Sequence, residues 1–117
     1  MPDPSSSAVT VTWAGDTATV TVRGELDLPT SAQAREQIAS VARNGPQWLV
    51  LDLVGVGDRF AAESLALIAV ARHLLPPECM LDVRSASPAV RQILRLAGWS
   101  GLASDTGNDA TESGQGG

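Results

Sequence analysis

Hydrophobic and polar residues alternate in two short stretches near the start of the chain. In "AVTVTWAG", Val9, Val11 and Trp13 fall on one side and threonines on the other, which is the period-two pattern of a half-buried strand. "TATVTVRG" repeats this pattern after Gly15-Asp16, a dipeptide typical of turns. Together the two stretches predict a β-hairpin.

The segment "SAQAREQIASVARN" has the apolar spacing i, i+4, i+7 and i+8 of an amphipathic helix. The Asn-Gly-Pro sequence that follows it is expected to end this helix. Pro29 disfavours helical geometry at the residue before it, so we expect Thr30 or Ser31 to cap the N-terminus.

Helical spacing returns in residues 60–75, and a Pro-Pro dipeptide follows. A last helix is predicted in "SPAVRQILRLAGW", where Ser87 is suited to cap the helix, Pro88 to occupy its first position and Gly98 to end it. The apolar stripe of this last helix consists of Val90, Ile93, Leu94 and Ala97.

The stretch "WLVLDL" contains consecutive apolar residues, as in a strand that is buried on both faces and lies centrally in its sheet. "CMLDVRS" is expected to form a short fourth strand. The order β-β-α-β-α-β-α predicts an α/β fold with a mixed sheet of about four strands. Its later connections should be right-handed crossovers, and its helices should pack mainly on one face.

The chain has 117 residues, which suits one domain. Residues 1–7 are rich in proline and serine and are expected to be flexible. Residues 8–102 carry the predicted elements. Residues 103–117 contain no large apolar side chain and are expected to be a disordered tail.

Composition narrows the possible functions. The formal net charge is −5, so the surface should repel nucleic-acid backbones. No apolar run approaches the length of a membrane span, and the N-terminus does not resemble a signal peptide. Cys79 is the only cysteine and is expected to be a buried structural thiol. We therefore expect a cytoplasmic, monomeric protein that is not inserted in a membrane.

The residues offer little enzyme chemistry. His73 is the only histidine and is expected to be a solvated side chain, and one histidine with one cysteine cannot supply a metal site. Ser64 lacks the G-x-S-x-G context of a hydrolase nucleophile, and the chain has no P-loop. We expect neither a cofactor nor catalysis, with a small nucleotide-binding protein or hydrolase as the alternative of this class.

Three motifs occur in an order that matches a known family. "VRGELDLPTSAQAREQI", "LVLDLVGV" and "VRSASPAVRQILRLAGW" resemble, respectively, the second strand with its helix, the central strand, and the last strand with its helix of the STAS domain. This is the fold of bacterial anti-sigma factor antagonists. The similarity runs from about residue 9 to residue 102.

One segment departs from the family pattern. Family members usually carry Asp-Ser-Ser/Thr-Gly-Leu after the central strand, and a partner kinase phosphorylates the first serine. If this chain has one extra residue in the loop, "AAES" aligns with Asp-Ser-Ser-Gly, and Leu65 aligns with the family's leucine. If it has no extra residue, "FAAE" aligns with Asp-Ser-Ser-Gly instead. The acceptor position then holds Ala62 or, in the second alignment, Ala61, and an alanine methyl cannot accept a phosphoryl group.

Three nearby residues carry open alternatives. Glu63 is either an ordinary carboxylate in the first turn of a helix or a permanent mimic of phosphoserine. Ser64 is a possible displaced acceptor. Asp27 is either a capping residue or part of the docking loop.

The resemblance implies an anti-sigma factor antagonist that binds a kinase-like anti-sigma factor and releases a sigma factor. The alternative is a STAS subunit that docks on the ATPase of a membrane lipid-transport complex, which needs no phosphoacceptor. The expected partner-binding residues are Glu25, Asp27, Thr30, Ala61, Ala62, Glu63 and Ser64.

Overall fold

The computed structural model describes residues 9–98 of the chain. The predicted flexible N-terminus (1–7) and disordered tail (103–117) lie outside the described residues, as do residues 99–102 at the end of the predicted domain.

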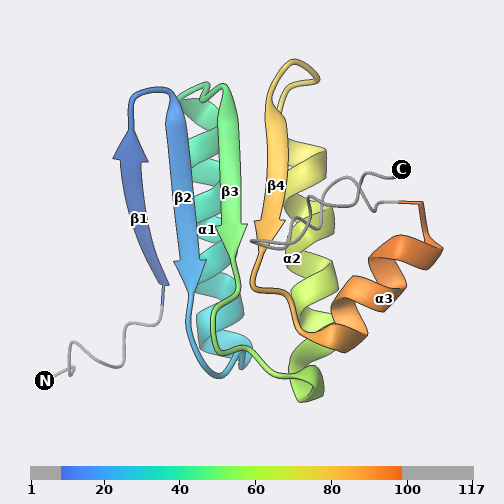
Figure 1. Ribbon diagram of the computed structural model, residues 1–117. Coiled ribbons are helices and arrows are strands. Elements are labelled where there is room, and N and C mark those ends of the chain that lie inside the picture. The colour runs from blue at the N-terminus through green and yellow to red at the C-terminus, as the bar shows by residue number, and fades with distance from the viewer. Residues whose placement is uncertain (1–8, 99–117) are drawn as a thin grey trace, which may run out of the picture.

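Four strands form one mixed sheet (Figure 1). They are β1 (Val9–Ala14), β2 (Thr17–Val22), β3 (Trp48–Asp52) and β4 (Met80–Arg84), and they lie side by side in that order. β1 pairs with β2 in antiparallel orientation, whereas β2–β3 and β3–β4 are parallel pairs. The predicted hairpin, the central position of "WLVLDL" and the mixed sheet are confirmed.

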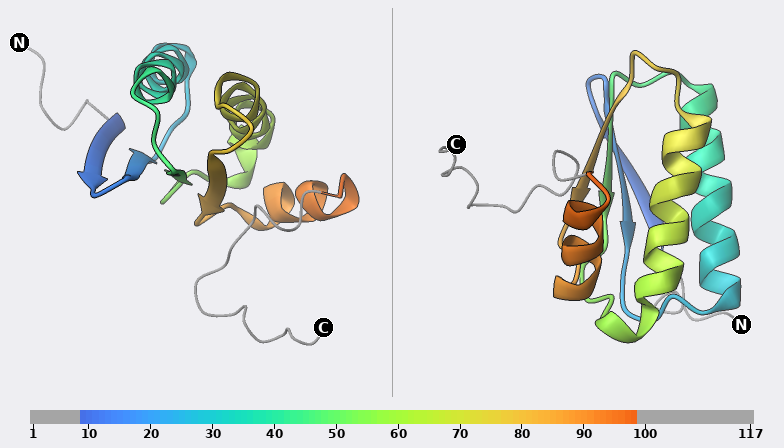
Figure 2. Two further views of the ribbon diagram at one scale, coloured as in Figure 1. Left: turned by 90° about the horizontal axis from the view of Figure 1, so that it is seen from above. Right: turned by 90° about the vertical axis from the view of Figure 1, so that its right-hand side faces the viewer.

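The described helices are α1 (Leu28–Arg43), α2 (Ala61–Leu74) and α3 (Pro88–Leu96), with a short 3₁₀ turn, η2 (Asp58–Phe60), before α2. Figure 2 shows α1 and α2 against the same face of the sheet, whereas α3 lies beyond the edge formed by β4. The element order and the packing of helices mainly on one face agree with the prediction.

The core lies between the sheet and the pair α1 and α2. In β3, Leu49 and Leu51 are fully buried in this core, and Val50 is buried on the opposite face. Alternate residues of β2 also enter the core, because Ala18, Val20 and Val22 are fully buried. Trp13 departs from the prediction: β1 is an edge strand, and this side chain is 46% exposed.

The start of α1 also differs from the prediction. The helix begins at Leu28, and its cap is Asp27 and not Thr30 or Ser31. Pro29 is tolerated because it lies in the first turn, where backbone N–H groups have no helical acceptor.

The apolar stripe of α3 is narrower than predicted. Val90 and Leu94 are buried, but Ile93 is 42% exposed and Ala97 is exposed. Because α3 packs against η2 and α2 and not over the sheet, only one side of it is covered. Its predicted cap is confirmed: the Ser87 side chain accepts a hydrogen bond from the Val90 N–H.

Candidate functional site

The first turns of α1, α2 and α3 lie at one end of the sheet, where the parallel strands finish (Figure 1). In sheets of this kind, loops that follow parallel strands commonly form binding sites. We call residues 23–28 and 54–63 the helix-start corner. It contains every predicted partner-binding residue except Thr30 and Ser64.

Backbone contact holds the two loops of the helix-start corner together. The Gly24 N–H donates to the Val54 carbonyl oxygen over 3.4 Å. Gly55 has φ +79°, and a Cβ atom there would lie 3.4 Å from the Gly24 nitrogen. The structure therefore brings together the two segments that the sequence predicted to form one docking face.

Asp27 fixes the start of α1. Its Oδ1 atom accepts a hydrogen bond from the Thr30 backbone N–H at 3.1 Å. Side-chain and backbone hydrogen bonds from Thr30 lower the pKa of the Asp27 carboxyl group. The capping interpretation of Asp27 is confirmed, and because its carboxylate stays exposed it remains available for a second role in docking.

Asp58 joins the helix-start corner to α3. Its Oδ1 accepts a hydrogen bond from the Ala89 N–H at 3.1 Å. Hydrogen bonds from the Ser87 side chain and from Ala89 lower the pKa of Asp58. The sequence did not reveal this link, because Ala89 lies 31 residues after Asp58 and no local pattern relates the two.

The start of α2 carries Ala61 and Ala62, the two residues that the sequence analysis expects at the acceptor position. No side chain caps this helix, since Phe60 occupies the cap position. Ala62 and Glu63 are exposed in the first turn, and Ala61 is half-buried. The structure thus presents a methyl group, and no hydroxyl, on the surface at Ala62.

Ser64 requires a correction. Its exposed fraction is 1%, because it lies on the inner side of α2 with Leu67, Ile68 and Ala71. A kinase cannot reach this hydroxyl in the folded protein, and a docking partner cannot contact it. We therefore remove Ser64 from the candidate acceptors and from the docking face.

Two exposed apolar residues in the helix-start corner were missed by the sequence analysis. Leu28, the first residue of α1, is 85% exposed, and Val54 is 36% exposed. The sequence pattern Leu-Asp-Leu-Pro could have indicated the exposure of Leu28. In the structure Leu26 is fully buried, Asp27 caps the helix, and the next side chain, Leu28, is exposed.

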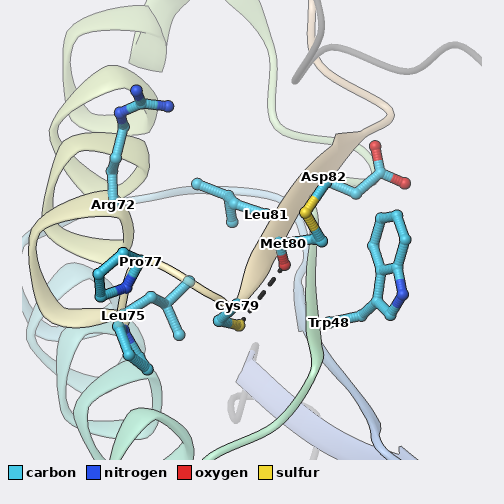
Figure 3. A pocket seen from close by; sticks show the side chains of 9 residues that line it. Trp48, Arg72, Leu75, Pro77, Cys79, Met80, Leu81 and Asp82 are labelled. Atoms are coloured by element: carbon cyan, nitrogen blue, oxygen red, sulfur yellow. Dashed lines mark hydrogen bonds between the residues drawn. The ribbon is translucent and has the colours of Figure 1, made fainter.

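A separate hollow of about 490 Å³ lies at the other end of β4 (Figure 3). Its walls include Trp48, Arg72, Leu75, Cys79 and Met80, and none of the predicted site residues. The Cys79 thiol donates to the Met80 carbonyl oxygen over 3.6 Å, and burial raises its pKa. The thiolate is therefore disfavoured. Cys79 is half-buried, however, and not fully buried as predicted, because it lies at the wall of this hollow.

Residues 9–98 contain no group of three or more histidine, cysteine and acidic side chains that could hold a metal ion. None of the described helices combines the length and the apolar character that crossing a bilayer requires.

Comparison with known proteins identifies the fold. The family model described as "Mlab, STAS domain" matches residues 9–104. No curated protein matches the chain significantly. Among solved structures, an anti-sigma factor antagonist from Mycobacterium paratuberculosis is 26% identical with a TM-score of 0.63, over 83% of this chain and 82% of its own.

Two structures of SpoIIAA share the fold at lower identity. The anti-sigma factor antagonist SpoIIAA in its unphosphorylated form is 17% identical with a TM-score of 0.59, over 86% of this chain and 90% of its own. The Bacillus cell fate determinant SpoIIAA in the phosphorylated form is 15% identical with a TM-score of 0.61, over 86% and 93%. The family match extends over most of the chain, and the chain therefore belongs to the STAS domain family.

Proposed function

We propose that this protein is an anti-sigma factor antagonist, which binds a kinase-like anti-sigma factor through the helix-start corner and thereby releases a sigma factor. Two findings support the proposal: the most similar solved structures named above are anti-sigma factor antagonists, and the corner offers an exposed, firmly held surface. The proposed role needs no covalent chemistry, and the proposal includes a cytoplasmic, monomeric protein.

The observation that carries the regulatory part of the proposal is the exposed methyl group of Ala62. A phosphoserine in the first turn of a helix would add about −1.5 to −2 charges, next to backbone N–H groups that can bind it. Such a charge would change a docking surface from one that binds to one that repels. An alanine removes this switch, so the antagonist would be active whether or not a kinase is present.

Glu63 does not act as a phosphate in this proposal. Its carboxylate is exposed and makes no hydrogen bond or ion pair within residues 9–98. A phosphoserine mimic would be held by a helix N-terminus, as the carboxylate of Asp27 is held by that of α1 and the carboxylate of Asp58 by that of α3. Glu63 is therefore an ordinary exposed charge of the first turn.

A sigma-release assay tests the proposal. A purified kinase-like anti-sigma factor is bound to its sigma factor. The protein is then added with and without prior incubation with ATP and a catalytic amount of the same kinase. We expect equal sigma release in both cases, whereas an Ala62→Ser variant should lose activity after incubation with ATP. ATP-dependent loss of release by the unaltered protein, with phosphate on residues 60–65, would overturn it.

A second candidate function has specific support. The matching family model is described as "Mlab, STAS domain", and a STAS subunit that docks on the ATPase of a membrane lipid-transport complex needs no acceptor hydroxyl. The same surface, with its exposed methyl, would serve that role. Co-purification with a transport ATPase and no binding to an anti-sigma factor would favour this second candidate.

A further inference from the structure

Leu28 is the most exposed large apolar side chain in residues 9–98, and its exposure is not required by the fold. The neighbouring Leu26 is fully buried and supplies the core contact of this segment. The Asp27 cap, with its extended backbone, then directs the next side chain away from the core. Leu28 therefore contributes its apolar surface to solvent and not to the interior.

Local electrostatics also argue against a leucine here. The first position of a helix faces the positive end of the helix dipole, where an acidic residue is stabilising. A polar or acidic side chain would thus suit this position at least as well for stability. The Leu28 side chain thus leaves a large apolar surface free for contact with a partner.

A second apolar residue lies on the adjoining loop. Val54 is 36% exposed, and its own carbonyl oxygen receives the Gly24 N–H. The two loops are joined at this point, so Val54 lies on the loop next to the segment that leads into Leu28. An apolar centre inside a polar rim is the usual composition of a protein–protein interface.

The rim is predominantly acidic. The helix-start corner contains four carboxylates, those of Glu25, Asp27, Asp58 and Glu63, and two arginines, Arg23 and Arg59. The guanidinium group of Arg59 lies over the Phe60 ring, 5.1 Å from its centroid. The carboxylates of Glu25 and Glu63 are exposed and make no ion pair within residues 9–98, so both are available to a cationic partner.

We propose that Leu28 is the apolar anchor of the partner interface, and that the partner presents an apolar pocket bordered by arginine or lysine side chains. This inference rests on the proposed function and specifies its partner. Leu28 enters the pocket, Val54 covers its margin, and the acidic rim orients the partner by charge. Anchors of this kind carry a large share of binding energy, whereas rim charges mainly affect the rate of association.

Calorimetric titration tests the anchor. The probes are the purified kinase-like anti-sigma factors encoded by the source bacterium, titrated with the full chain and three variants. We expect Leu28→Ser to weaken binding about 30-fold and Leu28→Met to restore most of the affinity. The matched control is Leu96→Ser on α3, because Leu96 is 77% exposed but lies outside the helix-start corner; its affinity should change less than about 2-fold.

Each outcome has a distinct meaning. If the unaltered chain binds and Leu28→Ser changes the affinity less than about 2-fold, Leu28 is not the anchor. The proposed function would still be supported. Binding of none of these anti-sigma factors by the unaltered chain would overturn both. Thermal unfolding that matches the unaltered protein shows that a variant is folded.

The cationic rim of the partner predicts weaker association as NaCl is raised, and affinity that is independent of salt would contradict it.

Discussion

The carboxylate of Asp58 accepts a hydrogen bond from the backbone N–H of Ala89, which links the turn before α2 to the first turn of α3. The two residues are 31 positions apart in the chain. The same carboxylate is also hydrogen-bonded by Ser87, the cap of α3. The Asp58 side chain therefore stabilises the N-terminus of α3 and fixes the turn that leads into α2.

Asp58→Asn should lower the stability of the protein at neutral pH. Hydrogen bonds from the Ser87 side chain and the Ala89 N–H lower the pKa of Asp58 in the folded state below its ordinary value. The contribution of its charge is therefore present above pH about 4 and is lost as pH falls through the folded pKa. The melting temperature of the variant should be lower by about 4 °C at pH 7. The difference should shrink towards zero as the pH is lowered below about 4.

Asp16→Asn is the matched control, because Asp16 lies in the exposed β1–β2 turn and its side chain makes no described hydrogen bond. Thermal melts from pH 7 to pH 3 should distinguish the two variants. An Asp58→Asn protein that melts in parallel with the unaltered protein at every pH would show that the link to α3 does not stabilise the fold.

Gly55→Ala should destabilise the protein and loosen the helix-start corner. Gly55 has φ +79°, where a side chain costs about 1–2 kcal/mol. The added Cβ would also lie 3.4 Å from the Gly24 nitrogen, against the loop that it adjoins. Gly57→Ala is the control, since a Cβ there meets nothing within 4 Å. Urea unfolding of the two variants provides the comparison, and equal stability would show that the positive φ of Gly55 does not require glycine.

A negative charge should be tolerated at Ala62 but not at Ser64. Ser64→Asp would place an unpaired carboxylate at a site that is 1% exposed, and we expect it to lose about 3 kcal/mol or more of stability. Ala62→Asp should be close to neutral, because this side chain is exposed at a helix N-terminus. Chemical denaturation measures both, and a stable Ser64→Asp protein would reopen Ser64 as a modification site.

Glu63→Gln should weaken partner binding slightly, by no more than about 3-fold, because an exposed rim charge contributes little affinity. A phosphoserine mimic predicts the opposite sign, since removal of its charge would strengthen binding. Titration of the variant with the anti-sigma factor therefore decides between the two interpretations of Glu63. Tighter binding by the variant would establish mimicry.

Hydrophobic spacing, together with turn and capping residues, was sufficient to predict the order of the elements along the chain and the approximate position of each strand and helix. β3 could be placed in the centre because "LVL" is buried on both faces, and the α3 cap could be placed because Ser-Pro is a local signal. The exposure of Trp13 and Ile93 could not be predicted. Both lie at the margins of the sheet, where the pattern of one element does not reveal whether a neighbour covers it.

The candidate site was predicted less completely. The two loops were correctly assigned to one face, but the bond between Gly24 and Val54 depends on how separate segments meet. Ser64 was misplaced although the sequence could have placed it: it lies three and four residues before Leu67 and Ile68, which puts it on the buried side of α2. Asp58 was missed because its partners come from α3, far away in the sequence.

The proposed function requires the partner to bind at the helix-start corner. At 12.1 kDa the chain is suited to amide-resolved NMR, and ¹⁵N-labelled protein can be titrated with its unlabelled anti-sigma factor. We predict that the perturbed amides cluster at residues 23–31 and 54–63. Perturbations confined to the opposite end of the sheet, around Trp48 and Met80, would contradict the account.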